Sequence, residues 1–304
     1  QTLGFADLRL LDIGDFIQVR GEIVKTKTGE VSLAVATIKL LTKSLRPLPE
    51  KWAGIKDPET AFRKRYLDLL MNPEKKERFV RKAKFWEANR KFMKDHGFIE
   101  VETPILETTV GGADARPFVT HMNALDQDFF LRISTELFEK RLLAGGFEKI
   151  YTLGPNFRNE GMDDEHLPEF YQLEWYWAYA DYRDGMKFVK EMYRYVAKEV
   201  YGRTKFTSRG MTYDLADDWE EIDYAKVIKE KLGVDIFSST DGAMLKVVKA
   251  KGLKLPGDIN RVRLIDNLWK LVRKEIAGPA FLINEPKFMS PLAKSKPDNP
   301  ELTE

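Results

Sequence analysis

The sequence contains no cysteine among its 304 residues. A disulfide framework, a thiolate metal site and a cysteine nucleophile are therefore excluded as bases for its fold or chemistry. It also lacks an apolar run of the roughly 18 residues that a membrane span needs. Its first residues, QTLGFADLRL, do not have the pattern of a secretory signal peptide. From these absences we expect a cytoplasmic protein with no membrane partner.

Neither sign of charge is in excess, because 50 lysines and arginines are matched by 48 aspartates and glutamates, leaving a net charge of +2. Binding of a polyanion must therefore depend on a local patch. The Gly-x-x-x-x-Gly-Lys phosphate loop and the Gly-x-Gly-x-x-Gly dinucleotide motif are also missing. A nucleotide, if one binds, has to bind in another way.

The secondary-structure signals that are present predict an α+β fold. Two β-rich runs, 16–24 and 31–41, flank a glycine-containing turn, and a proline-containing linker follows. Hydrophobic periodicity predicts further helices at about 74–96, 135–144, 184–201, 221–232 and 259–277, and strands at 98–101 and 279–284. Strands and helices in this mixed order, around a central hairpin, favour α+β over a doubly wound sheet.

The central hairpin is predicted from residues 156–179, NFRNEGMDDEHLPEFYQLEWYWAY, with a polar loop at Gly161–Pro168. Alternation places Arg158 and Glu160 on one face of the first strand. On the second strand, one face carries Phe170, Gln172, Glu174 and Tyr176, and the other carries Leu173, Trp175, Trp177 and Tyr179. We expect the apolar face to pack on a core and the polar face to be either solvated or a binding floor.

Spacing alone leaves two interpretations of the polar face open. In the first, this is an ordinary hairpin with cross-strand ion pairs, such as Arg158 with Glu174. In the second, it binds a nucleotide and a cation: Arg158 offers a planar fork for a phosphate or carboxylate, and Phe170 offers a stacking surface for a base. Glu174 and Tyr176 would then hold an ammonium group, and His166 would approach a polyphosphate.

A resemblance to a known family favours the second interpretation. The segments FRNEG at 157–161, His166, PEF at 168–170, LE at 173–174 and AYADY at 178–182 resemble motif 2 of class II aminoacyl-tRNA synthetases in its lysyl form. FIEVETP at 98–104 resembles motif 1, where a long helix and strand build the dimer interface. GGADARPF at 111–118, NALD at 123–126, LRISTEL at 131–137 and SPLAK at 290–294 are similar to other lysyl segments.

The resemblance also implies a domain organisation. Residues 12–50 resemble the end of an anticodon-binding OB barrel and its linker, and residues 5–9 resemble an earlier barrel strand, as if the part between were deleted. We therefore expect a partial OB fold at 1–45, a linker at 46–72 and a class II catalytic domain at 73–304. Motif 3 and the acidic Mg²⁺ ligands are expected beyond residue 304, so no metal ligand is expected within this chain.

The resemblance implies a lysine–tRNA ligase that activates lysine with ATP to lysyl-adenylate and transfers the lysyl group to the 3′ end of tRNA(Lys). Arg158 would be catalytic, bridging the lysine carboxylate and the α-phosphate. Glu160, His166 and Phe170 would bind the adenine amino group, the outer phosphates and the adenine ring, respectively. Gly112 and Glu136 would hold the α-ammonium of lysine, and Glu174 and Tyr176 its side chain. The family also implies Mg²⁺ and a homodimer formed through the 74–104 region.

Three alternatives are weighed against this assignment. A lysyl ligase acting on elongation factor P resembles the same core but has no OB barrel, so residues 12–50 and the loop at 113–118 argue against it. An aspartyl- or asparaginyl-type synthetase needs a cationic partner for its substrate's side chain, whereas Glu174 and Tyr176 suit an ammonium. A catalytically deficient, synthetase-derived binding module stays open.

Overall fold

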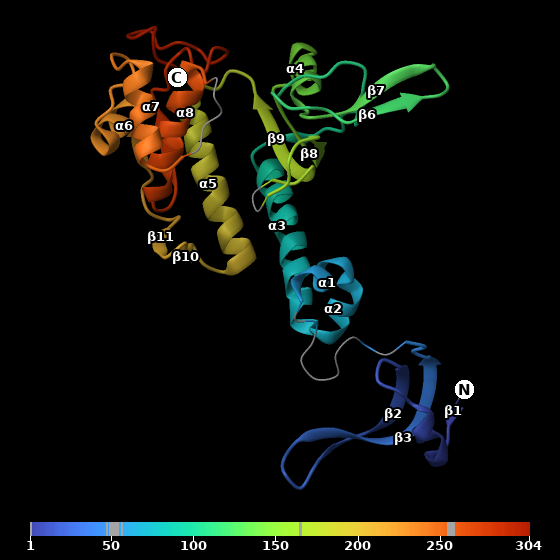
Figure 1. Cartoon of the computed structure of the whole chain (residues 1–304). Helices are drawn as coiled ribbons and strands as arrows, with labels where there is room; N and C mark the ends of the chain where they lie inside the picture. Colours follow the sequence, from blue (N-terminus) through green and yellow to red (C-terminus); the bar gives the residue numbers. More distant parts are fainter. Residues whose placement is uncertain (1, 47, 49–54, 56, 164–165, 254–258) are drawn as a thin grey trace. The chain divides into compact units, whose positions relative to one another are not determined.

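The computed structural model describes residues 2–46, 48, 55, 57–163, 166–253 and 259–304. The chain divides into two compact units, Gln1–Lys82 and Ala83–Glu304, and each is described by itself. Figure 1 shows the order of their helices and strands along the chain. Part of the expected linker, at 46–72, lies outside the described residues.

The first unit contains a three-stranded antiparallel sheet in the order β1-β3-β2. The strands are β1 (Thr2–Leu3), β2 (Phe16–Lys25) and β3 (Val31–Thr42), and the last two confirm the predicted β-rich runs. The turn between β2 and β3 places Gly29 at a φ of +87°, where glycine is favoured. No closed barrel is present among the described residues, so the partial OB fold stays a prediction.

The expectation of a strand at residues 5–9 is wrong. The 3₁₀ helix η1 (Phe5–Leu10) occupies this segment. Its start is held by the Asp7 carboxylate, which accepts a hydrogen bond from the Gly4 N–H at 2.9 Å. A short acidic side chain that can satisfy a free N–H at a helix start favours a helical turn over an extended strand.

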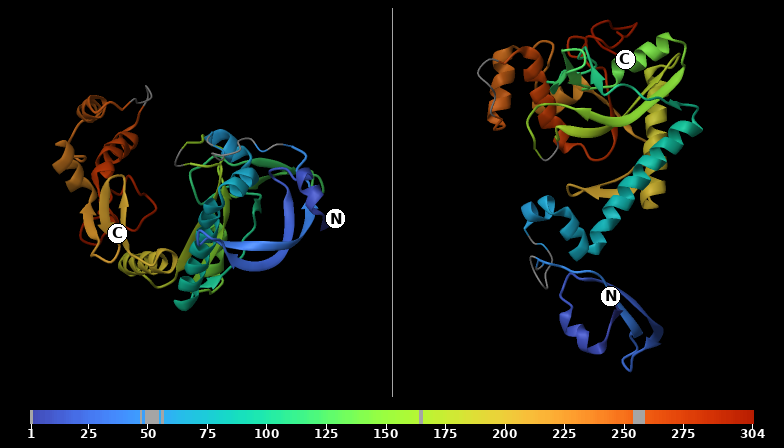
Figure 2. Two further views of the ribbon diagram at one scale, coloured as in Figure 1. Left: turned by 90° about the horizontal axis from the view of Figure 1, so that it is seen from below. Right: turned by 90° about the vertical axis from the view of Figure 1, so that its right-hand side faces the viewer.

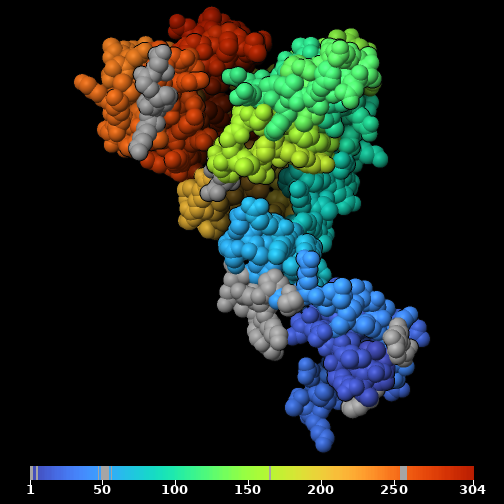
Figure 3. Space-filling view, turned by 45° about the vertical axis from the view of Figure 1, so that its right-hand side comes forward, coloured from blue at the N-terminus to red at the C-terminus, as the bar shows by residue number. Residues whose placement is uncertain are grey.

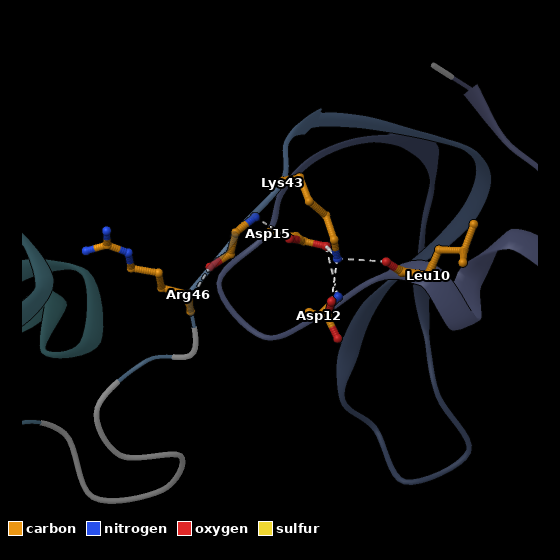
Figure 4. Close-up of polar contacts among 6 residues, drawn as sticks. Leu10, Asp12, Asp15, Lys43 and Arg46 are labelled. Atoms are coloured by element: carbon orange, nitrogen blue, oxygen red, sulfur yellow. Dashed lines mark hydrogen bonds and ion pairs between the residues drawn. The ribbon is translucent and has the colours of Figure 1, made fainter.

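A polar cluster holds the two ends of the β2–β3 pair together (Figure 4). The Lys43 ammonium donates to the Leu10 carbonyl at 2.8 Å, to Asp12 at 2.5 Å and to Asp15 at 2.8 Å. Asp15 also accepts from the backbone N–H groups of Asp12 and Ser44, at 2.8 and 2.7 Å. The Asp15 side chain is only 2% exposed, so these donors satisfy a buried carboxylate.

Helices follow the sheet. Residues 57–71, in the stretch expected as linker, include the short helices α1 (Pro58–Arg63) and α2 (Arg65–Met71), and Asp57 caps α1 by accepting from the Thr60 N–H at 2.8 Å. After the 3₁₀ turn η2 (Pro73–Lys75), helix α3 (Lys76–Asp95) confirms the helix predicted at 74–96. Gly97 lies just past its end at a φ of +80°.

The second unit is built around a sheet in the order β4-β8-β9. Strand β4 (Ile99–Glu100) pairs parallel to β8 (Lys149–Phe157), and β8 pairs antiparallel to β9 (Glu169–Trp177). One face of this sheet packs against α3 and α5 (Tyr182–Tyr201), as Figures 1 and 2 show. The core between them contains Phe92, Met93, Phe98, Tyr151 and Phe188, with Leu173, Trp175 and Trp177 packed against it.

The predicted apolar face of the hairpin is therefore confirmed for Leu173, Trp175 and Trp177. The placement of Tyr179 on that face is wrong. Strand β9 ends at Trp177, and Tyr179 has a φ of +62° and a side chain that is 96% exposed. Alternation holds only while the backbone stays extended, and it stops at this turn.

Three short strands and a helix flank the central sheet. β5 (Leu106–Glu107), β6 (Val119–Met122) and β7 (Gln127–Leu131) form an antiparallel sheet in the order β5-β7-β6. Helix α4 (Glu136–Ala144) follows directly, confirms the helix predicted at 135–144, and contacts both β8 and β9. The polar side chains of the hairpin thus lie near the start of α4.

The last third of the chain forms a helical part with its own core. Hairpin β10 (Lys205–Ser208) and β11 (Met211–Asp214) precedes it. The other elements are β12 (Glu220–Asp223), α6 (Tyr224–Leu232), α7 (Asp241–Ala250), α8 (Arg261–Val272), η3 (Arg273–Glu275) and β13 (Ala280–Ile283). The core includes Tyr224, Ile228, Met244, Ile265 and Leu268. The helices at 259–277 and the strand at 279–284 are confirmed, whereas α7 was not predicted.

The helix predicted at 221–232 is wrong in its first turn. Residues Glu220–Asp223 form β12, which pairs parallel to β13, and Asp223 caps α6 by accepting from the Lys226 N–H at 2.9 Å. The partner strand lies some 60 residues later in the sequence, so local periodicity could not indicate it. No helix among the described residues is long and apolar enough to cross a membrane.

Candidate functional site

The polar face of β9 holds a carboxylate that is fixed by uncharged donors. Glu174 lies opposite Thr152 of β8. The Ser134 hydroxyl, just before α4, lies 3.2 Å from both carboxylate oxygens of Glu174, and the Tyr176 hydroxyl donates to one of them at 3.2 Å. Burial, and then the charge of Glu174, raise the pKa of Tyr176, so this hydroxyl stays a donor. The arrangement holds a negative charge in place without neutralising it.

The ion pair between Arg158 and Glu174, one of the two interpretations left open by the sequence, is not formed. Glu174 is level with Thr152, six residues before Arg158 along the chain. The Arg158 guanidinium lies 5.1 Å from the centre of the Phe170 ring, and its Nη2 makes a long contact of 3.5 Å with the Ile133 carbonyl. Its buried Nε has no hydrogen-bond partner among the described residues. The described residues thus leave the hydrogen-bonding capacity of this guanidinium largely unsatisfied.

Gly112 and Glu136 lie beside the same serine. Gly112 has a φ of +84°, and a Cβ at this position would lie 2.8 Å from the Ser134 hydroxyl oxygen and 2.9 Å from the Glu136 Cβ. Glu136 opens α4, its N–H donates to the Ser134 hydroxyl at 3.2 Å, and its carboxylate pairs with Lys140 at 2.5 Å. The structure therefore gathers Gly112, Glu136, Glu174 and Tyr176 around Ser134.

Glu160 and His166 lie outside this cluster, in the hairpin loop. The prediction that Arg158 and Glu160 alternate on a strand is wrong, because β8 ends at Phe157. Glu160 instead accepts from the Arg116 N–H at 3.3 Å, while the Asn159 N–H donates to the Arg116 carbonyl at 2.7 Å. These bonds hold the 111–118 loop against the hairpin. The exposed His166 ring contacts Asp163 of its own loop at 2.8 Å.

A layer of buried charged groups beneath the cluster was not predicted from the sequence. Glu139 of α4 is fully buried, and Arg132 and Glu107 are 3% and 5% exposed. Burial raises the pKa of Glu139 to about 7, the hydrogen bond from Thr135 opposes this rise, and the charge of Glu174 adds to it. The one available signal was the spacing of Glu139 from Glu136, three residues along a helix and hence on the same side.

No group of three or more histidine, aspartate or glutamate side chains gathers as a candidate metal site within the described ranges. The Mg²⁺ implied by the resemblance stays a prediction.

Comparison with known proteins assigns the chain to a family. Residues 57–304 match the family described as tRNA synthetases class II (D, K and N). Proteins named Lysine--tRNA ligase are similar to the chain over 97–98% of its length: that of Thermotoga maritima is 49% identical, that of Thermoanaerobacter pseudethanolicus 47% and that of Clostridium novyi 45%. The chain spans 59–60% of the length of these relatives. The family match, which covers most of the chain, shows that the chain belongs to the class II tRNA synthetases (D, K and N).

Proposed function

We propose that the chain is the catalytic core of a lysine–tRNA ligase, which forms lysyl-adenylate from lysine and ATP and transfers the lysyl group to the 3′ end of tRNA(Lys). The observation that carries this proposal is the Glu174 carboxylate, which is held by the uncharged hydroxyls of Ser134 and Tyr176 and forms no direct ion pair among the described residues. An aspartyl or asparaginyl substrate side chain would meet repulsion or no partner there, whereas the ammonium of lysine supplies the missing charge.

The surrounding groups fit the two ends of the substrate. Glu136 and Gly112, whose missing side chain lets its backbone lie close to Ser134 and Glu136, would hold the α-ammonium of lysine. Arg158 would bridge the lysine carboxylate and the α-phosphate of ATP, and Phe170, under its guanidinium, would stack on adenine. Glu160 would accept from the adenine amino group, and His166 would lie near the outer phosphates.

The reaction itself requires positioning and charge neutralisation more than covalent chemistry by the protein. The lysine carboxylate attacks the α-phosphate in line, and pyrophosphate leaves. Arg158 would hold both reacting groups and stabilise the negative charge that develops between them. Mg²⁺, when bound, would neutralise the phosphate charges.

The test uses the full-length protein and measures amino-acid-dependent exchange of pyrophosphate into ATP. We expect exchange with lysine and none with aspartate or asparagine, followed by transfer of labelled lysine to tRNA. Transfer to elongation factor P in place of tRNA would support the alternative ligase. Absence of exchange with every amino acid, in a folded protein, would support a binding module and contradict the proposal.

A further inference from the structure

The carboxyl group of Glu139 is poorly suited to a permanent negative charge. It is fully buried. One oxygen accepts a hydrogen bond from the Thr135 hydroxyl at 2.8 Å, and the other has no hydrogen-bond partner among the described residues. An ionised carboxylate has about four lone-pair positions to satisfy. Thr135 and Thr152 both favour the ionised form of Glu139, but burial has the larger effect and raises the pKa. Thr135 donates to Glu139 although it is the N-cap residue of α4, whose N–H groups its side chain does not cap.

The protonation of Glu139 depends on the charges of the groups that face it, including the Glu174 carboxylate of the candidate site. Helix α4 packs on β8, which contributes Thr152, and on β9, which contributes the charge of Glu174 and the neutral Tyr176. The cation that faces Glu139 is Arg132. Burial lowers the pKa of Arg132, and the charges of Glu107, Glu139 and Glu174 oppose that fall. Its hydrogen bonds go elsewhere, to the Pro155 carbonyl at 2.9 Å and to Thr103 at 2.9 and 3.0 Å. The carboxyl groups of Glu107, Glu139 and Glu174 therefore interact electrostatically with the same buried guanidinium, that of Arg132.

We propose that Glu139 is a positioning residue that releases a proton when the ammonium of the substrate binds Glu174, and thereby strengthens selection of a cationic side chain. This inference rests on the proposed function. In the free site, Glu139 carries a proton below about pH 7. Burial is the main cause of the raised pKa of Glu139, and the charge of Glu174 adds to it. When an ammonium compensates Glu174, this added contribution is removed, the pKa of Glu139 falls, and near pH 7 part of the proton leaves to solvent. The bound ammonium then has a second negative charge beneath it.

The proposed proton release makes the affinity for lysine depend on pH. Burial raises the pKa of Glu139 to about 7 in the free site, and a cation at Glu174 lowers it. Lysine affinity should therefore rise with pH up to about 7 and become constant above that value. A fall of one pKa unit on binding corresponds to a rise of about tenfold in lysine affinity. It also corresponds to release of about half a proton per lysine at the midpoint between the two pKa values.

The experiment is titration calorimetry of the full-length protein with lysine, between pH 6 and 8, in buffers of different ionisation enthalpy. The wild type should release about half a proton near pH 6.5. Glu139→Gln should abolish the release, and its lysine affinity should not change with pH. Glu148→Gln, which removes an exposed carboxylate close by in sequence, is the matched control and should behave as the wild type. Norleucine, which lacks the side-chain ammonium, should cause no release.

A second variant does not depend on the stability of Glu139→Gln. Thr135→Val removes the hydrogen bond that favours the ionised form of Glu139, so the window of proton release should move to higher pH. Unchanged release in Glu139→Gln, or an unmoved window in Thr135→Val, would overturn the role of Glu139 and leave the proposed function intact. Failure of the folded wild type to bind lysine would contradict the proposed function itself.

Discussion

At the scale of single residues, the candidate site is built from two separate groups of side chains along β9. Phe170 and Glu174 lie on one face of the strand and differ by four positions, with Arg158 near the first and Ser134 near the second. A nucleotide base and a substrate ammonium can therefore be held by different side chains of one rigid strand. The contributions of Phe170 to ATP binding and of Glu174 to lysine binding should therefore be separable by mutation. Two substitutions test this.

We predict that Glu174→Gln in the full-length protein abolishes selection of lysine and leaves ATP binding largely unchanged. Glutamine keeps the size of the side chain and one acceptor, so the loss is electrostatic. A desolvated ammonium without its charged partner costs about 3–5 kcal/mol. This corresponds to a fall of roughly two to four powers of ten in kcat/KM for lysine. Steady-state kinetics with lysine and ATP varied separately measures the effect, and a change of less than about threefold would show that Glu174 is only a structural residue.

Phe170→Ala is the matched substitution on the same face of β9. This substitution should weaken the binding of ATP and leave the binding of lysine nearly unaffected, since loss of one base-stacking contact costs about 1–3 kcal/mol. The KM for ATP should accordingly rise by roughly one to two powers of ten in the same kinetic experiment. An equal loss for both substrates would mean that the substitution disturbs the strand and not a stacking surface.

At the scale of secondary-structure elements, the sequence predicts best where a local rule applies throughout the element. Alternation along β9 correctly separates Glu174 and Tyr176 from Trp175 and Trp177, because the strand is regular from end to end. The same rule fails for Glu160 and Tyr179, which lie beyond the strand ends. A strand boundary depends on where pairing stops, which the sequence of one segment does not specify.

The layer below the site could not be predicted for a related reason. Arg132 bonds to the Pro155 carbonyl 23 residues away, and Ser134 to Glu174 40 residues away. A buried glutamate in a helix, such as Glu139, has the same local sequence pattern as a solvated one. The roles of these residues depend on tertiary contacts of α4 with β8 and β9. Conversely, residues 221–223 of β12 are predicted as helix because the strand that pairs with them, β13, is distant in sequence.

A prediction at the same scale concerns the polar cluster that joins the ends of β2 and β3. Hydrogen bonds from the Asp12 N–H, from Lys43 and from the Ser44 N–H lower the pKa of Asp15 from 3.8 to about 2. Because the folded pKa is depressed, this carboxylate contributes stability above pH 3.8, and the contribution is lost as pH falls toward 2. Asp15→Asn should therefore destabilise the first unit at neutral pH, and the difference from wild type should shrink between about pH 4 and pH 2.

Hydrogen exchange of the β2 and β3 amides, compared between variant and wild type at each pH, measures this effect locally. Asp12→Asn is the control, because the Asp12 side chain is 72% exposed and that of Asp15 is 2% exposed. Asp12→Asn should change the hydrogen exchange of these amides less than Asp15→Asn does at every pH. A difference between Asp15→Asn and wild type that does not change with pH would mean that the buried carboxylate acts by its shape and not by its charge.

At the scale of the whole molecule, the 74–104 region leaves apolar side chains exposed. Phe79 is 50% exposed and Phe85 is 38% exposed on α3, part of which is seen at the surface in Figure 3. Ile99 is 54% exposed on β4, which is at the edge of its sheet. Exposed apolar side chains on a helix, beside a strand edge that no described strand pairs, favour association, and a two-fold interface is the commonest way to cover both.

We therefore predict that the full-length protein is a homodimer through this region and that Ile99→Arg dissociates it. An arginine at a buried two-fold interface would place two guanidinium groups without partners, each costing several kcal/mol, so the dimer Kd should rise by roughly two or more powers of ten. Tyr179→Arg is the control, since Tyr179 is 96% exposed and lies outside the 74–104 region. Sedimentation velocity at micromolar concentration should give a dimer for the wild type and Tyr179→Arg, and a monomer for Ile99→Arg. A wild type that sediments only as a monomer would contradict the prediction, and a dimeric Ile99→Arg would place the interface elsewhere.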